Sequence, residues 1–171
     1  MITTPEAGPV AIEMAIEAGD WGDAATLLAE VDRIIATALD IGRFEVSGSA
    51  ELSLVLTDDE HIRLLNRQWR GHDKATNVLS FPAGDGGEPA VSDDYADPPV
   101  LLGDIVIARE TLEREAIAED KSVADHFCHL LVHGFVHLMG YDHEDEAEAE
   151  EMEAIETEIL AGLGVADPYA D

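Results

Sequence analysis

A strongly apolar helix constrains the fold of this chain more than any other segment. The pattern predicts it from Ser122 to about Met139, where apolar residues lie on most sides of the helix. A helix of this kind has to be buried, so the other elements are expected to pack around it.

Shorter strand and helix patterns alternate along the rest of the chain. Apolar and β-prone runs predict strands at 11–17, 51–57, 76–81 and 101–108. Helical spacing predicts further helices at 23–40, from Asp58 onward, at 109–118 and at 144–163. Thr57 and Glu60 fit a capping box that would start the second of these helices. In the last helix the glutamates are expected to face outward and the apolar residues inward, namely Met152, Ile155, Ile159 and Leu160.

Because strands and helices interleave without repeats, residues 1–171 are expected to form a single α+β domain. It would hold one mixed sheet of about four strands, packed by about five helices. Residues 84–99 are rich in Gly, Pro and Asp, which predicts a flexible loop. The lone Cys128, the absence of a signal-peptide pattern and the lack of a long apolar run predict a soluble cytoplasmic protein.

Charge is unevenly distributed along the chain. The 38 acidic and 9 basic residues give a formal net charge of -29, which on its face opposes binding to a polyanion. Four of the nine basic residues nevertheless fall in one short segment: Arg63, Arg67, Arg70 and Lys74. Solvation explains most charge runs, and we apply that reading to the acidic stretch at 144–158 more than to the basic segment.

Three of the seven histidines lie within eleven residues at the end of the buried helix. His133 and His137 are four residues apart, so their rings project from one face of the helix about 6 Å apart. Gly140 stands where a left-handed residue commonly closes a helix, and such a turn could bring His143 back to the same cation. Three ligands would leave a fourth position open for hydrolytic chemistry.

The alternative is that these are separate histidines, solvated or hydrogen-bonded at a helix end. We favour a metal because two unpaired imidazoles in an apolar helix would cost free energy that a metal offsets. Zinc is the expected ion, one per chain, and nickel suits the same ligands. Groups considered as supports for the ligands are Asp142, His129 and Asp104, although sequence alone places neither aspartate near the metal. His126 is interpreted mainly as a core or supporting residue, and Cys128 as a small buried hydrophobe.

The histidine spacing matches the zinc-protease signature His-Glu-x-x-His-x-x-Gly-x-x-His at all but one position. Where those proteases carry the glutamate general base, this chain has Gly134, which cannot move a proton. A metalloprotease is therefore kept only as the alternative to another kind of metal-dependent hydrolase.

The segment His-Gly-Phe-Val-His-Leu-Met-Gly-Tyr-Asp-His at 133–143 resembles the signature of the YbeY endoribonucleases. Three further blocks are similar to that family, at 65–82, at 102–105 and at 150–158. The resemblance covers roughly residue 52 to the C-terminus. Ala75 departs from it, because proline is common there in the family.

This resemblance implies a single-strand-specific, metal-dependent endoribonuclease of ribosomal RNA maturation, including 16S rRNA 3′ end processing, and of ribosome quality control. It implies that His133, His137 and His143 hold the metal and that Arg70 is functionally important. The expected partners are a single-stranded rRNA precursor and the small ribosomal subunit or its proteins, with no membrane and no DNA. A non-catalytic ribosome-associated factor is the remaining alternative.

The basic segment agrees with an RNA substrate. Arg63, Arg67 and Arg70 are spaced to share a helical face, and a guanidinium suits phosphate oxygens. Surface ion pairing is the alternative, which we favour for Arg63 and not for Arg70. RNA contacts are therefore predicted for Arg67, Arg70 and Lys74. Trp69 could stack on a base, but the pattern favours a buried core residue.

The predicted mechanism uses a metal on three histidines to polarise a phosphate or activate bound water. Arg70 would stabilise charge on the phosphoryl group. The general base is left unassigned, and a ribose hydroxyl of the substrate could be the nucleophile instead.

Overall fold

A five-stranded sheet is the framework of the protein in a computed structural model that describes residues 2–3, 10–46, 49–83 and 100–170. The strands are β1 (Ile2–Thr3), β2 (Val10–Ile16), β3 (Ala50–Thr57), β4 (Val78–Pro82) and β5 (Val100–Ala108). The helices are α1 (Ala24–Ile41), α2 (Asp59–Arg70), α3 (Arg109–Ala118), α4 (Val123–Leu138) and α5 (Glu146–Gly162). The predicted α+β class, mixed sheet and five helices are confirmed for these residues, and the loop predicted at 84–99 lies outside them.

The strands lie in the order β1-β2-β3-β5-β4. The pairs β2–β3 and β3–β5 are parallel, whereas β1 and β4 pair antiparallel with their neighbours and form the two edges. Sequence analysis missed β1, whose two residues are too few for an alternating pattern. The edge strand β4 lies between α4 and Arg70 and contacts both.

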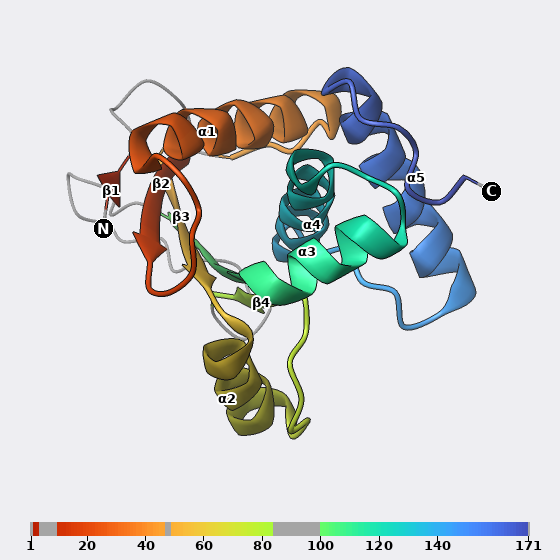
Figure 1. The fold of residues 1–171 in the computed structure, drawn as a ribbon. Coiled ribbons are helices and arrows are strands. Elements are labelled where there is room, and N and C mark those ends of the chain that lie inside the picture. Colours follow the sequence, from red (N-terminus) through yellow and green to blue (C-terminus); the bar gives the residue numbers. More distant parts are fainter. Residues whose placement is uncertain (1, 4–9, 47–48, 84–99, 171) are drawn as a thin grey trace.

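Helix α4 is the buried helix that the sequence predicts. Ten of its sixteen residues are buried, including Leu131, Val132 and Phe135 at 0% exposure. Figure 1 shows α4 with α1, α3 and α5 around it and α2 set apart at one end of the sheet. The main core joins α1, α4 and α5 to the sheet, and a smaller cluster forms where Ile62 of α2 packs with Val106 of β5. None of the described helices has both the length and the apolar character needed to cross a membrane.

The start of α2 differs from the predicted capping box. Asp58 is the N-cap, and its carboxylate accepts a hydrogen bond from the backbone N–H of His61 at 2.9 Å. Thr57 instead ends strand β3, where it is fully buried. Aspartate is a stronger N-cap than threonine, so the helix begins one residue later than predicted.

Gly103 allows three elements to meet closely. Its φ is 137°, and a Cβ placed there would lie 2.3 Å from the carbonyl oxygen of Phe81 and 2.9 Å from Cδ2 of Leu138. The lack of a side chain therefore permits β4 and the end of α4 to approach β5.

We expect Gly103→Ala to lower the free energy of unfolding by at least about 2 kcal/mol, from backbone strain and overpacking together. Gly22→Ala is the matched control, because Gly22 has a φ of 80° and open space around it. The control should lose only about 1–2 kcal/mol, the strain contribution alone. Urea denaturation of both variants measures the difference, and equal losses would contradict the role of close approach.

Candidate metal centre

The three histidines of the sequence motif converge at the end of α4. Each offers a ring nitrogen, and these nitrogens all lie within 4.8 Å of one another. The ring centroids are 4.8 Å apart for His133 and His137, and 5.0 Å apart for His137 and His143. Gly140 has a φ of 101°, which is the left-handed turn that the sequence predicts and which returns His143 to the helix end.

Hydrogen bonds fix the orientation of the two helical rings. Nδ1 of His137 donates to the carbonyl oxygen of Tyr141 at 2.9 Å, and Nδ1 of His133 donates to the carboxylate of Glu156. Since Nδ1 carries the proton in both rings, each Nε2 keeps its lone pair. This is the arrangement in which protein groups orient metal-binding imidazoles, so the cluster could hold a metal ion.

Glu156 is the residue that sequence analysis missed. Its side chain is fully buried on α5, between Nδ1 of His133 and the hydroxyl of Tyr169, both of which donate to it. The expectation that every glutamate of this helix faces outward was therefore wrong. The signal was present in the spacing, because Glu156 lies four residues after Met152 and three before Ile159, on the inward face.

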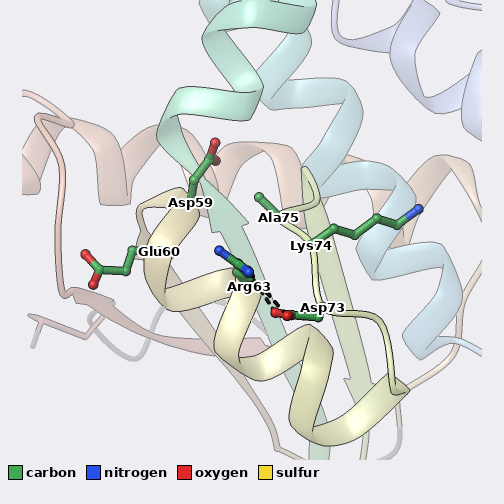
Figure 2. Close-up of a pocket in the computed structure, with 6 residues that line it drawn as sticks. All are labelled: Asp59, Glu60, Arg63, Asp73, Lys74 and Ala75. Carbon is green, nitrogen blue, oxygen red and sulfur yellow. Dashed lines mark hydrogen bonds and ion pairs between the residues drawn. The ribbon is translucent and has the colours of Figure 1, made fainter.

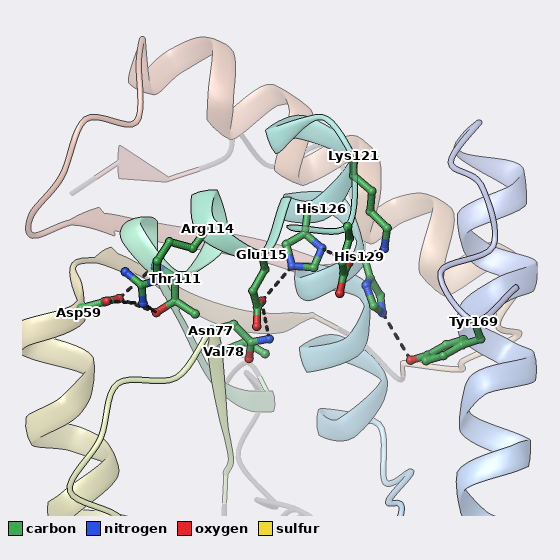
Figure 3. Close-up of polar contacts among 11 residues, drawn as sticks. Asp59, Asn77, Val78, Thr111, Arg114, Glu115, Lys121, His126, His129 and Tyr169 are labelled. Atoms are coloured by element: carbon green, nitrogen blue, oxygen red, sulfur yellow. Dashed lines mark hydrogen bonds and ion pairs between the residues drawn. The ribbon is translucent and has the colours of Figure 1, made fainter. Parts of the chain in front are cut away.

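Burial also lowers the pKa of two histidines, His137 and His129. Desolvation, followed by the charges of His133 and His143, holds the pKa of His137 below its usual value. A neutral imidazole is the form that binds metal. Burial lowers the pKa of His129 to about 4, and its Nε2 lies 3.4 Å from the hydroxyl of Tyr169. The ring of His129 also meets that of His133 edge to face, with centroids 6.3 Å apart, and Figure 3 shows its contact with Tyr169.

The two predicted aspartates lie differently. Oδ1 of Asp142 accepts from the backbone N–H of His143 at 2.8 Å and lies 3.9 Å from Nδ1 of that residue, so it stabilises the turn. Asp104 is exposed on β5. Its neighbours Gly103 and Ile105 face α4, so Asp104 projects from the other face of the sheet, and the structure does not bring it to the histidines.

Two other residues of α4 belong to the core. Burial raises the pKa of the Cys128 thiol to about 12, which confirms a small hydrophobe and disfavours a thiolate ligand. His126 is 2% exposed, and its Nε2 lies 2.9 Å from a carboxylate oxygen of Glu115 (Figure 3).

Arg70 lies beside the edge strand β4, which packs against α4. Its Nη2 donates to the carbonyl oxygen of Ser80 at 3.0 Å, and its guanidinium carbon lies 5.9 Å from the centroid of Phe81. The hydroxyl of Ser80 in turn donates to the carbonyl oxygen of Gly134, the residue after His133, at 3.2 Å. Within the described ranges Arg70 forms no ion pair with a carboxylate, which leaves its charge available to a ligand.

The other basic residues of α2 and its following loop are not equivalent. Arg63 makes two hydrogen bonds with the carboxylate of Asp73, at 2.8 and 3.2 Å, which confirms the expected ion pair. Arg67 and Lys74 are exposed. Lys74 lines a cavity of about 530 Å³ together with Asp59, Glu60, Arg63, Asp73 and Ala75. Figure 2 shows the Lys74 side chain extending away from the Arg63–Asp73 pair.

Trp69 contradicts the expectation of a core residue, because it is 65% exposed. It follows buried Ile62 by seven residues and therefore lies on the helix face that packs against the sheet. Its ring makes an edge contact with Phe81, with centroids 6.4 Å apart. The spacing predicted the face correctly, but the packing ends before the last turn of the helix.

Gly134 shows why the protease base is missing. A Cβ at this position would lie 3.0 Å from Oγ of Ser80 and 3.1 Å from Cγ2 of Ile105. The helix packs directly on β4 and β5 here, so no longer side chain fits without displacing the sheet.

We therefore expect Gly134→Glu to lower the free energy of unfolding by at least about 3 kcal/mol, because it overpacks the interface and buries a carboxylate. Ala124→Glu adds the same side chain at an exposed position near the start of α4 and should change stability by less than about 0.5 kcal/mol. Urea denaturation compares the two. Near-native stability of Gly134→Glu would refute the packing argument.

Comparison with known proteins agrees with the motif. The family model described as endoribonuclease YbeY matches residues 19–164. The Agrobacterium fabrum endoribonuclease YbeY is 53% identical over 167 residues, covering 93% of this chain and 94% of the relative. A Bradyrhizobium endoribonuclease YbeY is 55% identical over 159 residues, covering 93% and 92% respectively. A solution structure from Thermotoga maritima, 22% identical, shares the fold with a TM-score of 0.50 over 93% of this chain and 100% of that one. The chain belongs to the endoribonuclease YbeY family.

Proposed function

We propose that this chain is a single-strand-specific, metal-dependent endoribonuclease of ribosomal RNA maturation, with roles in 16S rRNA 3′ end processing and ribosome quality control. Its family membership supports the class of reaction. The expected substrate is a single-stranded rRNA precursor in the cytoplasm, reached through the small ribosomal subunit or its proteins.

One observation carries the proposal: two rings with hydrogen-bonded Nδ1 atoms, and a third from the following turn, present ring nitrogens to one point. His133, His137 and His143 would hold a single divalent ion, zinc by the nature of the ligands, with nickel as the alternative. Such an ion acts as a Lewis acid toward a phosphate oxygen and lowers the pKa of water.

The chain's own residues supply positioning and charge. Glu156 keeps the proton of His133 on Nδ1 and fixes the ring. Arg70, held at Ser80 beside Gly134, offers a guanidinium that can bind phosphate oxygens as negative charge develops on them. Arg67 and Lys74 would contact other phosphates of the RNA backbone than the one at Arg70. The packing at Gly134 disfavours the protease alternative, because the usual position of the base is filled by the sheet.

Cleavage of a single-stranded RNA is the direct test. The wild type should cut it and stop when a chelator is added, and His133→Ala should lose both bound metal and activity. Arg70→Ala should slow cleavage by about 10²–10³-fold while keeping its metal, because it removes charge stabilisation only. Gel analysis of RNA products and elemental analysis measure these effects.

Two matched controls accompany this test. His72→Ala removes an exposed histidine outside the cluster, and Arg63→Ala removes the arginine of α2 that is paired with Asp73. Both should cleave RNA within about two- to threefold of wild type, the effect of an exposed ion pair or less. Chelator-insensitive cleavage, or full activity in His133→Ala, would remove the proposal.

Glu156→Gln should weaken divalent-metal affinity by about 10–100-fold, because a neutral amide holds the His133 proton less strongly than a carboxylate does. Glu153→Gln removes the same charge from an exposed position of α5 and should leave affinity unchanged. Competition with a chromogenic chelator measures both. Equal affinities would show that Glu156 does not position a ligand.

A further inference from the structure

Trp69 is the exposed end of an otherwise buried face of α2. Along α2 the side facing the sheet carries Ile62 at 0% exposure, Asn66 at 4% and then Trp69 at 65%. The spacings of four and three residues place all three on one face. The large aromatic ring therefore points to the side where the core lies but extends past the residues that could cover it.

Phe81 supports this ring on one side. The two rings meet edge to face, with an angle of 62° between their planes, and Phe81 is itself half-buried. Arg70 lies over the Phe81 ring and is held at Ser80. An aromatic contact of this kind fixes the orientation of Trp69 while leaving much of its surface open.

The charges near Trp69 indicate which class of ligand its ring could bind. In a chain of net charge -29, Arg67 and Arg70 both lie in the last turn of α2 with Trp69. An exposed aromatic ring among cations suits a ligand that is flat and apolar in one part and anionic in another. An unpaired nucleobase with its phosphates has this chemistry, and base stacking on aromatic rings is how proteins bind single strands without reading sequence.

We propose that Trp69 is a stacking subsite for an unpaired base of the RNA, with Phe81 as its support and Arg70 on the adjoining phosphate. This inference rests on the proposed function and makes it more specific, because only a strand with unpaired bases can use the ring. The path from Trp69 through Phe81, Arg70 and Ser80 to Gly134 leads to the histidine cluster. A base held at Trp69 would therefore place its strand beside the candidate metal centre.

Tryptophan fluorescence tests the subsite without cleavage. The chain has two tryptophans, and Trp21 is only 8% exposed, so the signal that is lost in Trp69→Phe belongs to Trp69. With metal removed by a chelator, a short unstructured RNA should quench this signal. An abasic oligonucleotide with the same number of phosphates should not.

Affinity for the labelled RNA gives the second measurement. Trp69→Ala should bind it about 5- to 150-fold more weakly, with no change for the abasic strand, and Trp69→Phe should retain most of the affinity. Leu64→Ala is the matched control, because Leu64 is 56% exposed on another face of the same helix and should bind as wild type.

Equal binding of RNA by Trp69→Ala and wild type would overturn the subsite, as would an equal loss on both strands. If the Trp69 fluorescence is quenched on raising the protein concentration without RNA, a second copy of the chain covers the ring. That result would also overturn the stacking subsite. If the wild type cuts no RNA with metal present, the proposed function fails, whereas the quenching experiment still decides the stacking subsite separately.

Discussion

The packing of α4 against the sheet is the constraint on which the site depends. Gly134 lies against Ser80 and Ile105, and this contact fixes the height of the helix over the strands. The same packing sets where His133 and His137 emerge at the helix end. Because β4 is an edge strand, it also links α4 to Arg70 through Ser80. The packing of the core therefore determines where the side chains of His133, His137 and Arg70 lie.

Charge is organised locally rather than by the net value. Among the described residues the acidic side chains are mostly exposed, whereas Glu156, at 0% exposure, accepts hydrogen bonds from His133 and Tyr169. The arginines of α2 differ: Arg63 is paired with Asp73, whereas Arg70 contacts the carbonyl oxygen of Ser80 and the ring of Phe81 and pairs with no carboxylate in the part of the chain that the structure describes. A strongly anionic protein can in this way keep a small surface suited to phosphate.

Periodicity predicted most of the fold and the histidine cluster, since both depend on spacing along one element. It could not predict partners from distant elements. Glu156 meets His133, and Tyr169 meets Glu156, only through the packing of α5 and the chain after it. Asp104 lies on a different element, β5, and faces away from α4. Trp69 shows the same limit: its helical face was predictable, but its exposure depends on where the sheet and its neighbouring elements end.

X-ray absorption spectroscopy of the metal-loaded protein tests directly whether His133, His137 and His143 bind one ion, because it reports the ligands of the ion itself. The three-histidine site should give three imidazole nitrogens and at least one oxygen from solvent, with no sulfur. A sulfur ligand, fewer than three imidazoles, or a coordination shell filled entirely by protein groups would contradict it.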